Sequence, residues 1–238
     1  MTALVARSAG FFPQTRQSKI FEVARQSDGS WGDAVEVPFG DEETSDIDPF
    51  YVPDGSRVWF SSIRALDGVA RTDVDVWYVD RRPDGSWAEP VNAAEVNSPA
   101  DDLFPSIGPD GAVYAGSDRG GDGFDIWRAP ANADGTWGPA TVLSAPVTSA
   151  AWEFNPVFAP DGESLVFTAQ GREGGEGKGD LFFSRLEGET WTAPTAIAAV
   201  NTGSDEYHPA FSADGVTLYF VRQANMLQIA VSATELAD

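Results

Sequence analysis

Two short motifs recur along the 238-residue chain with nearly the same period. The first joins an acidic residue, a proline and an Asp-Gly turn, and its leading prolines stand 56, 51 and 53 residues apart, at Pro49, Pro105, Pro156 and Pro209. The second is an apolar segment with a glycine turn and a tryptophan, and its tryptophans stand 56, 50 and 54 residues apart, at Trp31, Trp87, Trp137 and Trp191. Two independent markers with one period indicate that a single structural unit is repeated.

Each unit is predicted to contain four short strands. The first carries the proline and leads into the Asp-Gly turn, where glycine accepts a positive φ. The second is an apolar segment, expected at 57–62, 112–117, 164–169 and 216–221. The third is of the Asp-x-Trp type, and a glycine hairpin joins it to a fourth strand that carries the tryptophan. Four strands in about 40–55 residues are typical of a propeller blade, and only residues 233–238 look helical.

We therefore predict an all-β protein that forms one domain over residues 1–238. It is a β-propeller of five blades, each of three to four antiparallel strands, around a central channel. The first unit lacks its initial strand and the last ends after its third strand, so the way in which the ring closes stays open. The predicted repeat units are 1–40, 41–98, 99–148, 149–202 and 203–238.

Composition narrows the function. With 15 basic and 37 acidic residues the net charge is −22, which argues against nucleic acid or anionic membrane as a partner and favours a soluble monomer. The absence of cysteine excludes disulfides and thiolate chemistry, and the only histidine, His208, excludes sites with several histidines. Residues 1–16 lack the features of a signal peptide, so a cytoplasmic location is expected.

The repeat resembles a known family. Its fullest form runs from Asn97-Ser through Asp101-Asp-Leu-Phe-Pro and Pro109-Asp-Gly to Ser117-Asp-Arg-Gly-Gly-Asp-Gly-Phe-Asp-Ile-Trp127. This pattern resembles the TolB-like, WD-type β-propeller repeat, over about residues 40 to 221. The resemblance implies a blade and no particular reaction, because members of that family serve as protein-binding platforms, as gating domains of peptidases and in some cases as carbohydrate-active enzymes.

The first strand of each blade should line the channel, and it carries acidic residues at one recurrent position: Asp46, Asp102, Glu153 and Glu206. One interpretation is a ring of carboxylates that binds a polar ligand or a divalent cation, Ca²⁺ or Mg²⁺. The other is architectural, with each carboxylate accepting backbone hydrogen bonds, and we favour it because the position recurs in every unit. Two residues further on, the side chain varies, through Asp48, Phe104, Asn155 and His208.

His208 and Glu206 are the candidate catalytic pair, since an imidazole beside a carboxylate can act as acid or base. A histidine that only satisfies its local hydrogen bonds is the competing interpretation. Trp152 and Tyr207 can stack on a sugar or simply pack. Arg7 and Arg222 end equivalent strands and would meet if the ring closes, where they would bind an anion or neutralise the acidic ring.

The loops at 118–125 and 171–180 combine glycines with acidic residues, a composition that can wrap calcium. Neither fits an EF-hand, and a solvated loop is the simpler interpretation. Two motifs of hydrolases, Gly-x-Ser-x-Gly and His-Glu-x-x-His, are absent from the sequence.

Two functions follow from these observations. The favoured one is a module that binds a polar small molecule or a protein partner at the mouth of an acidic channel, with Arg7, Asp46, Asp48, Asp102, Trp152, Glu153, Asn155, Tyr207 and Arg222 as its candidate binding residues. The alternative is a small hydrolase, lyase or isomerase acting on a polar small molecule or carbohydrate, with Glu206 and His208 as acid and base.

Overall fold

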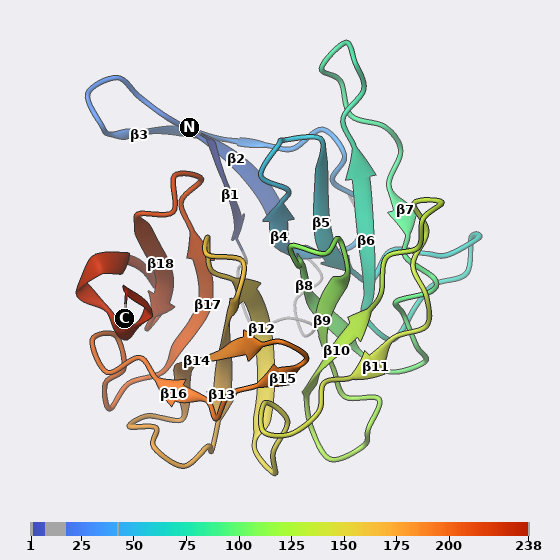
Figure 1. The fold of residues 1–238 in the computed structure, drawn as a ribbon. Helices are drawn as coiled ribbons and strands as arrows, with labels where there is room; N and C mark the ends of the chain where they lie inside the picture. The colour runs from blue at the N-terminus through green and yellow to red at the C-terminus, as the bar shows by residue number, and fades with distance from the viewer. Residues whose placement is uncertain (1, 8–17, 42, 238) are drawn as a thin grey trace. The chain divides into compact units, whose positions relative to one another are not determined.

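The structure is a computed structural model that describes residues 2–7, 18–41 and 43–237. The protein is an all-β, five-bladed β-propeller of small antiparallel sheets (Figure 1). The described residues contain no α-helix; two 3-10 turns, η1 (Val231–Ala233) and η2 (Glu235–Ala237), follow the last strand, where the helix-like stretch was predicted. No helix in this part of the chain is long and apolar enough to cross a membrane.

The chain divides into two compact units, unit 1 (Met1–Pro105) and unit 2 (Ser106–Asp238). Unit 1 holds two sheets, whose first strands β1 and β4 lie beside each other. The sheet orders are β1-β2-β3 and β4-β5-β6-β7, with bounds β1 (Thr2–Arg7), β2 (Lys19–Arg25), β3 (Trp31–Glu36), β4 (Asp46–Tyr51), β5 (Arg57–Ser62), β6 (Asp75–Asp80) and β7 (Val91–Asn92). Its core is apolar and includes Ile20, Phe39, Val58, Phe60 and Trp77.

The third sheet has the order β11-β10-β9-β8, and its strand β8 (Asp102–Ile107) contains the boundary between the units. Its other strands are β9 (Val113–Ser117), β10 (Asp125–Ala129) and β11 (Thr141–Val142). Two further sheets belong to unit 2. Their strands are β12 (Trp152–Phe158), β13 (Ser164–Gln170), β14 (Gly179–Glu187), β15 (Thr190–Trp191) and β16 (Thr195–Ala196), then β17 (Glu206–Phe211), β18 (Thr217–Arg222) and β19 (Asn225–Ala230).

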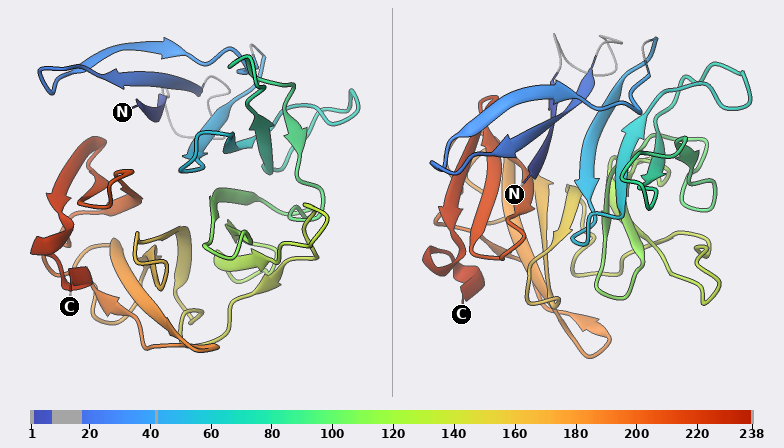
Figure 2. Two further views of the ribbon diagram at one scale, coloured as in Figure 1. Left: turned by 45° about the horizontal axis from the view of Figure 1, so that its top comes forward. Right: turned by 90° about the horizontal axis from the view of Figure 1, so that it is seen from above.

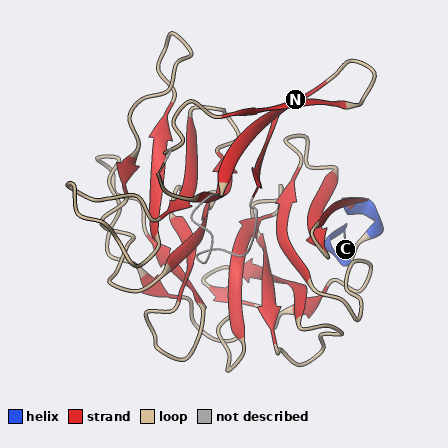
Figure 3. Cartoon of the chain, turned by 180° about the vertical axis from the view of Figure 1, so that it is seen from behind, coloured by secondary structure: helices blue, strands red, loops and turns tan. Residues whose placement is uncertain are grey.

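The sheets of unit 2 follow one another in chain order, as the green-to-red part of Figure 2 shows. The first strand of the fourth sheet, β12, lies beside β9 and β17, so the strands that carry the predicted site residues are neighbours. Figure 3 shows how strands dominate the chain and how loops join them. A buried cluster that includes Tyr114, Ile126, Leu165, Phe167 and Phe182 packs these sheets together.

The second strands lie at or within one residue of their predicted positions, at β5, β9, β13 and β18. The fourth strands differ from the prediction. In the second and third sheets the tryptophan forms only an isolated bridge, Trp87 with Arg81 and Trp137 with Ala131, and the outer strand begins later. Pro90 and Pro139 stand between each tryptophan and that strand. Proline has no N–H to donate, so it interrupts the ladder there.

Candidate functional site

The first strand of a blade contains a register break at its proline. The pairing shifts between Ile47 and Phe50 in β4, between Phe154 and Val157 in β12 and between Tyr207 and Ala210 in β17. At the break, the residue before the proline has a left-handed backbone, with φ of 52°, 57°, 52° and 53° at Asp48, Phe104, Asn155 and His208. This conformation is uncommon for residues with a Cβ, although Asp, Asn and His tolerate it best. The variable position of the repeat is therefore a shared backbone feature.

The recurrent acidic residues are buried, and each accepts hydrogen bonds from nearby groups. Asp46 accepts two hydrogen bonds of 2.8 Å from Arg64, while Asp102 accepts from the backbone and hydroxyl of Ser98. Glu153 is bonded by Ser149 and Arg172, and Glu206 by Thr202 and Arg222. Three of the four accept from a Ser or Thr four residues earlier in the chain. These contacts support the architectural interpretation of the acidic position.

Among the described residues, no group of three or more His, Asp and Glu side chains is arranged to hold a metal ion. The loop at 171–180 folds on itself instead. Its terminal carboxylate, Asp180, accepts hydrogen bonds from the backbone N–H groups of Glu176 and Gly177. The predicted Ca²⁺ or Mg²⁺ in the channel thus gains no support from the acidic residues Asp46, Asp102, Glu153 and Glu206.

Unit 2 carries a row of aromatic rings that crosses three sheets. Phe124 precedes β10 and lies 6.2 Å from Trp152 and 6.3 Å from Phe154, both on β12. Phe154 stacks on Tyr207 of β17 at 6.0 Å, with an interplanar angle of 25°. The next residue, His208, has its ring centroid 6.5 Å from that of Tyr207. Trp152 is 43% exposed, so the row ends in a ring that is accessible to solvent.

Two glycines let this row pack closely. A Cβ at Gly123 would stand 2.0 Å from Nε1 of Trp152, and a Cβ at Gly179 would stand 2.2 Å from Cε1 of Tyr207. Only a residue without a side chain fits against either ring. The positions of Trp152 and Tyr207 are therefore set by backbone that touches them.

Beside the aromatic row, β12 and β17 are joined by an amide–imidazole contact. Nδ2 of Asn155 lies 3.0 Å from Nδ1 of His208, and the hydroxyl of Thr168 on β13 donates to Oδ1 of Asn155 at 3.3 Å. Crowding by protein atoms lowers the pKa of His208 to about 4, although the residue is still exposed to solvent on one side. His208 is therefore uncharged at neutral pH.

The other predicted residues of unit 2 are engaged in the fold. Glu206 has no exposed surface and forms an ion pair of 2.5 Å with Arg222, which neutralises its charge. Tyr207 interacts with Asp205; burial, followed by this neighbouring carboxylate, raises the pKa of Tyr207 to about 12. Glu206 and Arg222 thus neutralise each other's charge.

In unit 1 the predicted residues are Arg7, Asp46, Asp48 and Asp102. The guanidinium of Arg7 lies over the ring of Phe21 at 5.2 Å. Burial raises the pKa of Asp48 to about 7, against the opposing effect of hydrogen bonds with Ser61 and the backbone of Phe104. Arg7 belongs to unit 1 and Arg222 to unit 2, so the anion site predicted for this pair stays a prediction.

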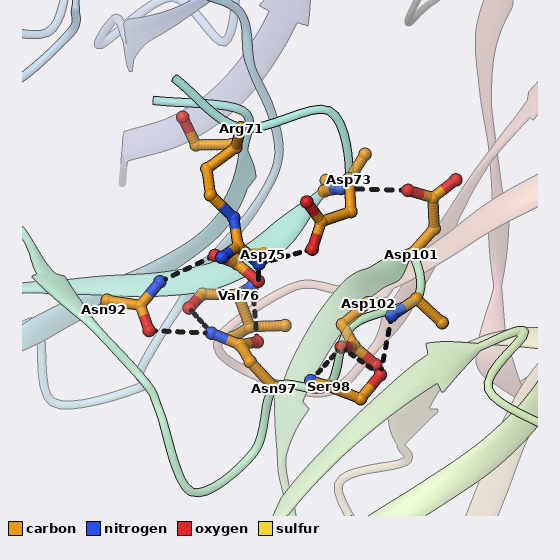
Figure 4. A network of polar contacts seen from close by, with 12 residues as sticks. Arg71, Asp73, Asp75, Val76, Asn92, Asn97, Ser98, Asp101 and Asp102 are labelled. Atoms are coloured by element: carbon orange, nitrogen blue, oxygen red, sulfur yellow. Dashed lines mark hydrogen bonds and ion pairs between the residues drawn. The ribbon is translucent and has the colours of Figure 1, made fainter. Parts of the chain in front are cut away.

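Unit 1 also contains a polar hollow of about 420 Å³ that the sequence did not suggest. Figure 4 shows Arg71 bonded to Asp73 and Asp75, and Asn92 donating to Asp75 at 3.0 Å. Burial, the largest effect, raises the pKa of Asp75 to about 6. Asn97 links Asn92 to both backbone groups of Val76, so the network fastens β6 to the chain that follows β7. These polar groups bond chiefly to one another.

Sequence reasoning missed two sets of residues. Phe124 and Phe154 complete the aromatic row but look like ordinary strand residues in the sequence. Arg64 and Arg172, each two residues beyond the second strand, provide the partners of Asp46 and Glu153. The signal for the arginines is periodic: Arg64, Arg119 and Arg172 each lie over an aromatic ring of the third strand, Trp77, Trp127 and Phe182.

Comparison with solved structures supports the fold alone. The chain is similar to the periplasmic gluconolactonase of Pseudomonas aeruginosa (TM-score 0.52, 20% identity), covering 96% of this chain and 64% of that one, which is less than two thirds of its length. It is similar to a TolB-like protein of Agrobacterium tumefaciens (0.59, 16%, covering 97% and 78%) and to an endo-arabinase of Bacteroides thetaiotaomicron (0.59, 13%, covering 96% and 89%). No family model and no curated protein matches the chain significantly. One fold thus serves proteins with different activities.

Proposed function

We propose that the protein is a ligand-binding module whose binding face is the aromatic row of unit 2, Phe124, Trp152, Phe154, Tyr207 and His208. The ligand we propose is an uncharged polar molecule with a flat apolar face, such as a carbohydrate. The observation that carries this proposal is the exposed ring of Trp152 at the end of a row of packed rings. Large exposed aromatic side chains are uncommon outside interaction sites, and they offer a stacking surface beside hydrogen-bonding groups.

The polar groups next to the row suit an uncharged ligand. Asn155 and His208 are both neutral at pH 7, and Arg222 is occupied by Glu206. A sugar would place its C–H face on the rings and its hydroxyls toward such groups. Because the rings are held against Gly123 and Gly179, little order has to be created when a ligand binds.

The enzymatic alternative has weaker support from the same geometry. Glu206 is buried, and its two oxygens accept hydrogen bonds from Thr202 and Arg222. A histidine with a pKa of about 4 is almost fully deprotonated at pH 7, so it is a weak general acid there. Proton transfer by this pair would require rearrangement of both residues, whereas binding requires none.

The test is a thermal-shift and calorimetric screen of neutral mono- and oligosaccharides. A ligand at 100 times its dissociation constant stabilises the fold by about 2.7 kcal/mol. We expect Trp152→Ala to weaken binding about fivefold or more, taking as a guide the stacking of a flat ligand on one aromatic ring, which contributes on the order of 1–3 kcal/mol for nucleobases. Met226→Ala is the matched control, because Met226 is 54% exposed in the same unit and lies on β19, two strands from β17 in the fifth sheet.

Equal affinities of Trp152→Ala and the unaltered protein for a sugar would refute the binding face. A screen in which no carbohydrate binds would refute the ligand class, and capture of a protein partner that needs Trp152 would replace it. Turnover of a bound sugar that is lost in Glu206→Gln would favour the enzymatic alternative.

A further inference from the structure

The hydrogen bonds of the Asn155 amide constrain where the imidazole of His208 carries its proton. The side chain of Asn155 is 6% exposed, and its amide is held at both ends, by Thr168 at Oδ1 and by His208 at Nδ2. With the Thr168 hydroxyl donating to Oδ1, the amide presents its N–H group to Nδ1 of His208. Nδ1 must then accept a hydrogen bond, and a neutral imidazole that accepts at one nitrogen carries its proton at the other.

We infer that Asn155 is a positioning residue that holds His208, the only histidine of the chain, as the uncharged Nε2–H tautomer. His208 belongs to the proposed binding face, so the inference describes that face, but its test does not depend on ligand binding.

The same contact disfavours the charged form of His208. Protonation at Nδ1 would set one N–H group against another, and the amide of Asn155 could relieve this only by turning over and reversing its hydrogen bond with Thr168. Crowding by protein atoms acts in the same direction and lowers the pKa of His208 to about 4.

The elements around the pair carry several titratable groups. Glu153 pairs with Arg172, Glu206 pairs with Arg222, and Tyr207 interacts with Asp205. Strand β18 also carries Tyr219, and β14, which packs against β17, carries Asp180, Arg185 and Glu187. The lowered pKa of His208 has desolvation by the surrounding protein atoms as its cause, and the contact with Asn155 acts in the same direction.

The test uses the fact that the chain has one histidine. In the full-length protein labelled with ¹⁵N-histidine, long-range ¹H–¹⁵N spectra between pH 4.5 and 8 contain a single imidazole, and the two tautomers differ in nitrogen shifts and coupling patterns. We expect the Nε2–H tautomer with no titration above pH 5. An Nδ1–H tautomer, or a midpoint near 6.5, would overturn the inference.

Asn155→Asp is the decisive variant. Aspartate has the same shape as asparagine and tolerates the left-handed φ of 52°, but its carboxylate can only accept, so it should draw the proton to Nδ1 and raise the midpoint by at least about one pH unit. Thr168→Val keeps the shape of Thr168 and removes the bond to Oδ1, so we expect both tautomers to appear. An unchanged tautomer and midpoint in both variants would show that Asn155 has no positioning role.

Trp152→Ala separates this inference from the proposed function, because it should weaken ligand binding and leave the imidazole spectrum unchanged. If the sugar screen fails while His208 shows the expected tautomer, the proposed function is refuted and the positioning role stands. If sugars bind through Trp152 while His208 titrates near 6.5, the positioning role is refuted and the proposed function stands.

Discussion

In unit 1, Nη2 of Arg64 donates to both carboxylate oxygens of Asp46, at 2.8 Å each. The side chain of Asp46 has no exposed surface and that of Arg64 has 9%. The guanidinium also lies over the rings of Phe60 and Trp77, at 4.9 and 5.5 Å. An ion pair so well shielded leaves an uncompensated buried charge when one partner is removed, and this cost exceeds what the pair itself contributes.

We expect Arg64→Met to lower the free energy of unfolding by about 3–5 kcal/mol, the usual cost of breaking a buried pair. Methionine retains apolar contact with the rings of Phe60 and Trp77, so the loss reports mainly on the charge. Denaturant titration measures the effect. The control is Arg57→Met, which breaks an ion pair with Asp80 that is far more exposed and should cost about 1 kcal/mol or less.

The double variant Asp46→Asn, Arg64→Met tests the cause. It removes the buried carboxylate as well as its partner, and we expect it to be more stable than Arg64→Met alone. A double variant as unstable as the sum of the two single variants would mean that lost packing, and not the orphaned charge, explains the effect.

Gly123 should control the position of Trp152. Gly123→Ala places a Cβ 2.0 Å from Nε1 of Trp152 and must displace the ring, whereas Gly121→Ala meets nothing within 4 Å. Both glycines have a positive φ, 113° and 90°, so both variants carry backbone strain and differ mainly in the contact with the ring.

We expect the indole N–H resonance that is absent from Trp152→Ala to move in Gly123→Ala and to keep its position in Gly121→Ala. Sugar affinity should fall in the first glycine variant only. Equal shifts in both variants would indicate that loop strain moves Trp152, and that close packing against Gly123 does not position it.

Asp48 should make stability depend on pH. Burial raises its pKa to about 7 in the folded protein, against 3.8 for the ordinary group. The folded state then binds the proton more tightly than the unfolded state, so this contribution to stability is complete below about pH 4 and is lost as pH rises through 7. We expect Asp48→Asn to abolish this loss of stability with rising pH, because the asparagine amide stays neutral.

Relative to the unaltered protein, Asp48→Asn should gain up to about 2 kcal/mol between pH 4 and pH 8, a figure reduced for solvent screening at this partly exposed residue. Thermal unfolding followed over that range measures it. Asp67→Asn is the matched control, since Asp67 has a similar φ of 51° but is exposed. A pH profile unchanged by Asp48→Asn would show that Asp48 is ionised in the folded protein near pH 7 as in the unfolded one.

The fold could be predicted because each blade repeats local signals: alternating strands, Asp-Gly turns and a fixed period. The outer strands of the second and third sheets could not be predicted. Pro90 and Pro139 determine where the hydrogen-bond ladder resumes, and the tryptophan before each proline marks only the hairpin. The recurrent acidic position was visible in the sequence, and Arg222 was considered as a residue that neutralises it, but the partners Arg64 and Arg172 were not. Whether Asp46 binds a ligand or Arg64 depends on contacts between residues 18 apart, which spacing alone does not reveal.

The aromatic row shows the same limit. Trp152, Tyr207 and His208 stood out as residue types, while Phe124 and Phe154 did not, since a phenylalanine near a strand is normally a core residue. Their role comes from ring contacts across three sheets. The left-handed backbone shared by Asp48, Phe104, Asn155 and His208 was also missed: Asp, Asn and His tolerate this conformation best, but Phe104 does not fit that preference.

The shared left-handed conformation before the proline distinguishes what the repeat fixes from what varies between blades. The repeat fixes the proline, the register break and the buried acidic residue. The residue directly before the proline differs between blades, and its side chain is a carboxylate, a phenyl ring, an amide or an imidazole. New chemistry at these places requires a change of one side chain and no change of chain path. At each of the four positions, taken separately, the repeat therefore offers a place where one side chain can be exchanged among the residue types that tolerate a positive φ.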